Sequence, residues 1–184
     1  MARSPRPRQG CAGALLATYA GVTPVLFLTA ALAIGVVAGL RTMTALMVVS
    51  WAARLRWVHL SGTWVAFLGG PVVPLVFTVL AAGELVGDQL PKTPSRTAPL
   101  PFAARVVSGA FSAAALATGV GESVLFGAVL GALGAVIGTL GGHAARTGLS
   151  RKWNVPDVAI AIPEDIVAVV GGFLVIAFVF LGAR

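Results

Sequence analysis

Five long apolar stretches, separated by short polar segments, make up most of the chain. The stretches run over residues 24–53, 64–83, 103–120, 124–142 and 166–182. Most are close to about twenty residues, the length that an α-helix needs to cross about 30 Å of hydrocarbon. None shows the alternation of apolar and polar positions that is typical of membrane β-strands, and only helices and closed barrels span lipid. The pattern therefore predicts an all-α, polytopic membrane protein with about five transmembrane helices.

The stretches predict a single transmembrane domain over residues 24–184, preceded by a basic N-terminal segment over residues 1–23. Allowing for their polar ends, the predicted helices cover about 24–53, 64–88, 101–120, 123–143 and 163–182. The first helix is too long for one simple crossing. It forms either one crossing or two elements that meet near Gly39, and the pattern leaves both open. The N-terminal segment resembles the start of a signal peptide but lacks a clear cleavage site, so we expect it to be retained.

Composition and charge support the membrane assignment and suggest an orientation. Hydrophobic residues make up 58% of the chain and charged residues 10%, whereas a soluble domain is about a quarter charged. The net charge of +7 does not indicate nucleic-acid binding, because the basic residues flank the apolar stretches. With five crossings, nine basic residues lie on one side of the membrane and three on the other. The nine are Arg3, Arg6, Arg8, Lys92, Arg96, Arg105, Arg146, Arg151 and Lys152, and the three are Arg54, Arg56 and Arg184. This predicts an inner (plasma) membrane protein with a cytoplasmic N-terminus and two cytoplasmic loops.

Small residues and a weak internal repeat suggest how the helices are arranged. Gly127 and Gly131, and then Gly134 and Gly138, have the four-residue spacing that lets helix backbones approach each other in lipid. We expect their helix to lie in the centre of the bundle or at a subunit interface. The sequence of residues 35–47 also resembles that of residues 105–117, which suggests a two-helix internal repeat like those of transporters.

Charged residues inside or at the edge of the apolar stretches are the candidate functional groups. Arg41 lies within the first stretch, where an unpaired guanidinium costs several kcal/mol, so it should face a carboxylate, water or the bundle interior. Glu84 and Asp88 are four residues apart, on one face of a helix that ends at Pro91. We expect Arg41 to interact with Glu84, Asp88 or Glu122, with Glu84 favoured. By contrast, Glu164 and Asp165 follow Pro163 and suit the first turn of the last helix.

The motif GELVGDQLPKTPSRT, followed by RVVSG, the earlier GLR and the late PED, is similar to a known family. The chain resembles, from about Gly35 to Gly172, small bacterial membrane proteins classified as domain of unknown function 4126. The resemblance implies a multi-helix integral membrane protein and implies no activity. It supports the importance of six residues, which are Arg41, Glu84, Asp88, Pro91, Pro94 and Arg96.

Several kinds of chemistry lack the residues that they require. His59, His143 and Cys11 are far apart in the sequence, so we expect no metal site, and we find no nucleotide or dinucleotide motif that would indicate a cofactor. The polar loops are too short for a soluble catalytic domain, and no activated nucleophile is evident. The chain is therefore more consistent with a protein that is not an enzyme.

Three functions remain compatible with the sequence. In the first, the protein transports a small solute or ion: Glu84 and Asp88 bind a proton or cation, Arg41 is their counter-charge, and Arg96 and Arg105 are further binding residues. In the second, it is an enzyme or carrier for a lipid phosphate, which Arg96 and Arg105 bind while Glu84 and Asp88 hold Mg²⁺. In the third, it is a structural membrane subunit. The lipid bilayer and a second copy of the chain are the expected partners, and the substrate and coupling ion are left open.

Overall fold

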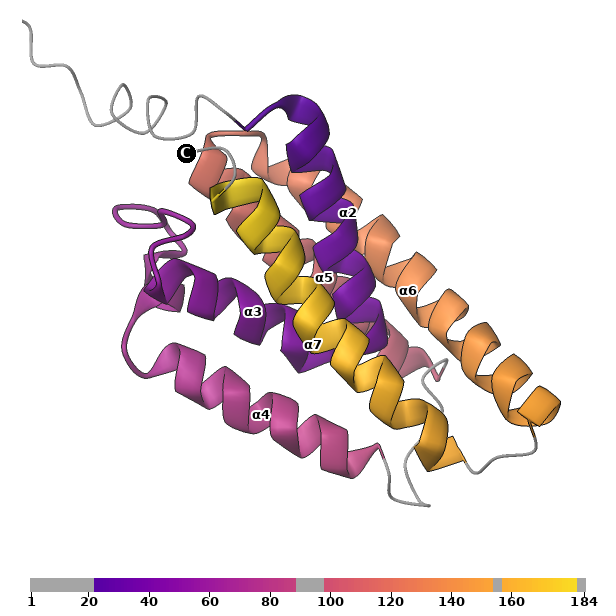
Figure 1. Ribbon diagram of the computed structural model, residues 1–184. Coiled ribbons are helices and arrows are strands. Elements are labelled where there is room, and N and C mark those ends of the chain that lie inside the picture. Colours follow the sequence, from indigo (N-terminus) through magenta and orange to yellow (C-terminus); the bar gives the residue numbers. More distant parts are fainter. Residues whose placement is uncertain (1–21, 89–97, 154–156, 182–184) are drawn as a thin grey trace, which may run out of the picture.

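A computed structural model describes residues 22–88, 98–153 and 157–181, which are helical apart from their connecting loops (Figure 1). The elements in chain order are α2 (Pro24–Leu40), α3 (Thr42–Arg54), the 3-10 helix η1 (Ala66–Gly69), α4 (Val73–Gly87), α5 (Pro99–Val120), α6 (Val124–Trp153) and α7 (Asp157–Leu181). This part of the chain contains no strand, which confirms the predicted all-helical fold.

Length and composition make the described helices suitable for a membrane. Three segments are long and apolar enough to cross one, namely Pro99–Val120, Val124–Ser150 and Ala161–Leu181, and α2 and α4 are shorter apolar helices. Large apolar side chains also cover the outside of the bundle, including Val79, Leu100, Leu125, Val167 and Phe178. Lipid solvates such a surface, whereas water does not. The protein is therefore a multi-pass membrane protein, although the predicted number of about five crossings is not confirmed.

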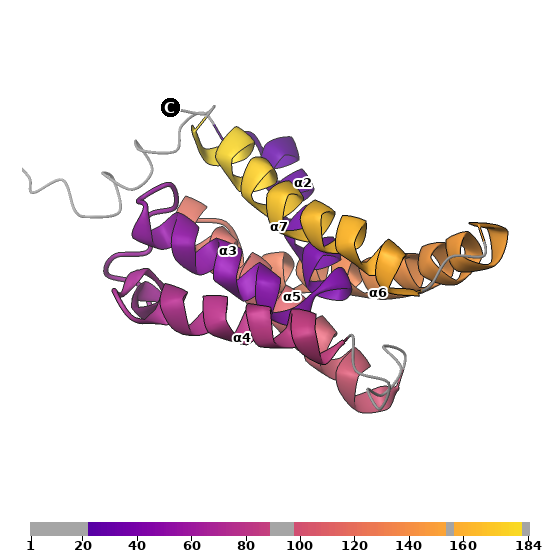
Figure 2. The ribbon, with the colours of Figure 1, turned by 60° about the horizontal axis from the view of Figure 1, so that its bottom comes forward.

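The region over residues 24–53, which the sequence left open as one crossing or two elements meeting near Gly39, consists of two helices that meet at Arg41. Arg41 has an extended backbone, with φ −143° and ψ 110°, and it is the only residue between α2 and α3. The two helices form a V in both views (Figures 1 and 2). Both arms of the V pack on α7. A Cβ at Gly172 of α7 would lie 3.1 Å from the side chain of Val48 in α3 and 3.6 Å from that of Val37 in α2. The chain therefore reverses direction at Arg41.

This reversal changes the topology that the sequence predicted. From α2 to α7 the chain changes direction between every pair of consecutive α-helices, so the start of α2 and the end of α7 lie at the same end of the bundle (Figure 1). Five crossings would place them at opposite ends. The ends of α4 and α6 both lie towards the other end. The two predicted repeats also differ, since residues 35–47 contain the break and residues 105–117 belong to the continuous α5.

Close backbone packing holds α6 between α2 and α5. On one face, a Cβ at Gly127 would lie 2.8 Å from the carbonyl oxygen of Ala113, and Gly131 directly faces the Gly109 carbonyl of α5. On the other face, Gly134 and Gly138 approach backbone carbonyls of α2. The predicted packing role of these glycines is confirmed. The helix does not lie in the centre of the bundle, however, because its outer side chains, Leu133 and Ile137 among them, are exposed.

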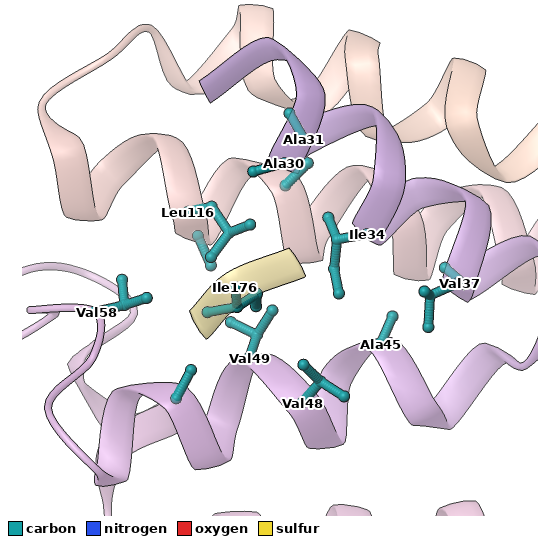
Figure 3. Close-up of a cluster of buried hydrophobic side chains, with 14 of the residues drawn as sticks. Ala30, Ala31, Ile34, Val37, Ala45, Val48, Val49, Val58, Leu116 and Ile176 are labelled. Carbon is teal, nitrogen blue, oxygen red and sulfur yellow. The ribbon is translucent and has the colours of Figure 1, made fainter. Parts of the chain in front are cut away.

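An apolar core fills the space between the arms of the V and the helices around it (Figure 3). Ile34 of α2, Val49 of α3, Leu116 of α5 and Ile176 of α7 come together there and are almost completely buried. Near Arg41 this core meets buried polar side chains, among them Arg41 itself, Arg105 and Thr139. The fold therefore places a polar site at the point of the V.

Replacing Gly131 by leucine should destabilise the bundle, because the new side chain has to push the backbone of α5 away. Overpacking of this kind costs about 1–3 kcal/mol or more. Gly141→Leu on the same helix is the matched control, since a Cβ there meets nothing within 4 Å. Unfolding of the purified proteins in increasing SDS measures both. Equal stability of the two variants would contradict the packing of α6 against α5.

Candidate functional site at the helix break

The break at Arg41 leaves backbone groups without partners in either helix, and side chains from neighbouring helices bind them. The last carbonyls of a helix have no intrahelical partner. Here Nη1 of Arg105 donates to the carbonyl oxygens of Gly39 and Leu40, at 2.9 and 2.6 Å. The hydroxyl of Thr139 is shared between the Ala135 carbonyl of its own helix, at 2.8 Å, and the Gly39 carbonyl, at 3.1 Å. The carbonyl end of α2 is thus closed by one residue from α5 and one from α6.

The amide end of α3 is closed by Glu84, which comes from α4. One carboxylate oxygen accepts from the amide of Thr42 and the other from the amide of Met43, both at 2.8 Å. A carboxylate in this position satisfies two free donors and lies at the positive end of the helix dipole. In addition, the hydroxyl of Ser108 donates to the Thr42 carbonyl at 2.6 Å. Glu84 therefore acts as a helix cap from a different helix, as well as being a charged group.

The guanidinium of Arg41 is completely buried between two aspartates (0% exposed). It forms an ion pair with Asp88, which directly follows α4. On its other side it pairs with Asp165 of α7, and its Nε donates to Asp165 Oδ1 at 2.6 Å. Two carboxylates from different helices therefore compensate the desolvation of one cation.

A second buried cation, Arg105, connects this pair to Glu84. Its Nη2 lies 3.8 Å from Oε1 of Glu84 and 4.0 Å from Oδ2 of Asp88. We call Arg41, Glu84, Asp88, Arg105 and Asp165 the Arg41 network. Its formal charge is −1, from two arginines and three carboxylates (2 − 3). Beside it, Arg146 and Glu164 form a further ion pair at 4.0 Å, which adds no net charge.

Access to the Arg41 network differs between its cations and its anions. The side chains of Arg41 and Arg105 are 0% and 4% exposed, while those of Glu84, Asp88 and Asp165 are 14–15% exposed. The carboxylates therefore form the side of the network that an ion or a proton can reach. The network therefore places three partly exposed carboxylates beside two buried guanidinium groups.

The family comparison agrees with the fold. Residues 28–183 match the family described as a domain of unknown function, DUF4126. The chain belongs to the DUF4126 family. All five members of the Arg41 network lie within the matched region. No curated protein and no solved structure matches the chain.

Four predicted site residues of this DUF4126 protein, Arg41, Glu84, Asp88 and Arg105, come together at the break. The partner predicted first for Arg41 was Glu84. Instead, the Arg41 side chain pairs with two aspartates, and Glu84 binds the backbone amides next to it. The predicted residues Pro91, Pro94 and Arg96 lie outside the described residues.

Two acidic residues have positions that the sequence analysis did not anticipate. Asp165 was interpreted as part of a helix start, but it lies more than two turns after the beginning of α7 and pairs with Arg41. The sequence did contain a signal for this pairing. A buried arginine requires a carboxylate to compensate its charge, and the chain has only six acidic residues to choose from. Glu122 is exposed in the turn between α5 and α6, far from Arg41 along the bundle (Figure 1).

Ser108→Ala should destabilise the protein by about 0.5–2 kcal/mol, because it removes a donor to the Thr42 carbonyl at the break. Ser112 is the matched control. It lies one turn further along the same helix and is fully buried, and its hydroxyl has no hydrogen-bond partner among the residues that the structure describes. Ser112→Ala should be neutral or slightly stabilising. SDS unfolding compares the two, and a larger loss for Ser112→Ala would contradict this arrangement of the break.

Proposed function

We propose that this DUF4126 protein transports a small solute or an ion, and that the Arg41 network is its ion-binding site. The observation that carries the proposal is the interrupted helix, since α2 and α3 stop against each other inside the bundle and charged side chains surround the interruption. Secondary transporters bind their substrates and coupling ions where helix ends and free backbone groups meet inside the bundle.

The energetic cost of the network supports a functional role. An uninterrupted helix satisfies its own backbone, whereas the break leaves free carbonyls and amides that need partners in a medium without water. Five ionisable side chains supply or support these partners, and ionisable groups within membrane segments are expensive and usually functional. A purely structural junction could be built at lower cost from apolar residues and hydroxyls.

The charge of the network indicates what it binds. With a formal charge of −1, the network becomes neutral when it takes up one proton or one monovalent cation. Glu84 and Asp88 are its partly exposed carboxylates on α4, and Arg41 is their internal counter-charge. We therefore propose proton or cation coupling, with an inner (plasma) membrane location.

The alternative of an enzyme or carrier for a lipid phosphate receives less support. It requires Glu84 and Asp88 to hold Mg²⁺, but Glu84 is directed to backbone amides and Asp88 to a guanidinium. Homo-oligomer formation remains part of the transport proposal, because short helices such as α2, α3 and α4 enclose little space within one chain.

The proposal is tested by ion flux into liposomes that contain the purified protein. A trapped pH-sensitive dye, pyranine, reports proton entry driven by a valinomycin-induced potassium potential, and a sodium gradient tests cation exchange. The wild-type protein should conduct faster than empty liposomes in at least one assay. Glu84→Gln should reduce the rate to that of empty liposomes, because the amide keeps the shape and removes the charge. Asp88→Asn should have a milder effect, since Arg41 keeps Asp165.

Glu122→Gln is the control for these substitutions. It removes a carboxylate of the same kind from the far end of the bundle, so its flux should equal that of the wild type. Equal flux of Glu84→Gln and wild type, with both proteins folded, would reject the network as the transport site. It would favour the structural interpretation of the charges.

A further inference from the structure

We infer that α4 is the moving element of this protein and that Glu84 and Asp88 are a proton-sensitive latch which holds it closed. The inference rests on the proposed transport function and names the part that would move during transport. It follows from the packing of α4, from the charged groups that attach its inner end, and from the position of Asp165.

The packing of α4 is much weaker than that of the other helices of the V and its neighbours. Pro74 and Ala81 are its only buried residues, whereas α3 buries eight and α5 buries ten. Its main neighbours are α3 and η1, and it lies along the outer side of α3 (Figures 1 and 2). A Cβ at Gly83 or Gly87 would meet nothing within 4 Å, so its inner end is loosely surrounded. Little apolar contact has to be lost when α4 moves.

Polar bonds attach the inner end of α4 instead. Glu84 binds the two amides at the start of α3, and Asp88 pairs with Arg41. Further along the helix, Nε1 of Trp51 donates to the hydroxyl of Thr78 at 2.9 Å. The first two attachments depend on the charge of a carboxylate. A proton on either group weakens them, because a neutral carboxyl is a poorer acceptor and no longer forms an ion pair.

Asp165 allows the latch to open without leaving a bare charge in the bundle. Removing the partner of a buried cation is strongly unfavourable, which would normally hold α4 in place. Arg41 has a second partner in Asp165 of α7, however, and keeps it when Asp88 leaves. Among the described residues, the charged groups that face Glu84 and Asp88 are Arg41 and Arg105. When either Glu84 or Asp88 binds one proton, the Arg41 network is left with two cations and two anions.

Movement of α4 away from α3 would expose a positively charged binding surface. The amides of Thr42 and Met43 would lose Glu84, and Arg105 would lose its nearest carboxylate. Two free amides at a helix N-terminus next to a guanidinium favour an oxyanion. Uptake of a proton by Glu84 or Asp88 is thereby linked to exposure of an anion-binding surface. The solute that suits this site is a carboxylate or phosphate anion that is transported together with protons.

Distances between spin labels test the movement of α4 in the full-length protein. One label replaces Val79 of α4 and the other Val167 of α7, both of which are exposed, in a background where Cys11 is replaced by serine. The reference pair joins Leu133 of α6 to Val167. At about pH 8 the α4–α7 pair should give one main distance. As the pH is lowered stepwise from about 8 towards about 3, a range that covers the protonation of carboxylates, that distance peak should be lost and replaced by a different one. The reference pair should not change.

Substitutions separate the latch from general effects of acid. Glu84→Gln and Asp88→Asn should each give the low-pH distances already at about pH 8, because each weakens an attachment of α4. Asp165→Asn should keep the closed distance at about pH 8, since it removes a carboxylate that is not on α4. A distance that is independent of pH and of Glu84→Gln and Asp88→Asn would overturn the moving-helix inference while leaving the flux result untouched. Release of α4 by Asp165→Asn alone would also overturn it.

Discussion

Backbone polar groups cannot be left unsatisfied in a membrane, and this constraint organises the structure around Arg41. The chain changes direction there within a single residue, so the carbonyl end of one helix and the amide end of the next meet inside the bundle. Arg105 and Thr139 bind the carbonyls and Glu84 binds the amides. Four helices besides α2 and α3 therefore have to converge on one point, with α7 contributing Asp165.

The rest of the fold brings these helices close enough. Glycines on two faces of α6 let it contact the backbones of α2 and α5 at the same time, which places Thr139 beside Gly39. The one-turn spacing of Arg105 and Ser108 on α5 puts both side chains on the break. By contrast, α4 contributes charge with little packing. Rigid helices thus position the cations, and a loosely packed helix carries two of the three carboxylates.

The apolar pattern was sufficient to predict the helices and the membrane, because lipid requires long apolar segments. Arg41, Glu84, Asp88 and Arg105 were also identifiable, since charge within such segments is costly. The reversal at Arg41 was not predictable from the pattern alone: no proline marks it, and apolar residues continue on both sides. Asp165 was assigned to a helix start because a local explanation was available, and its pairing with a residue 124 positions away depends on the tertiary fold.

The pairing of Arg41 with Asp165 across the break is tested most directly by stability measurements on a single and a double variant. Arg41→Gln leaves three partly buried carboxylates with one remaining cation and should cost about 3–5 kcal/mol in SDS unfolding. Adding Asp165→Asn returns the network to its original charge of −1 and should recover a large part of that loss. Adding Glu122→Gln instead should recover nothing. If Asp165→Asn deepens the loss of Arg41→Gln, or recovers no more than Glu122→Gln, Arg41 and Asp165 do not form the pair on which the break depends.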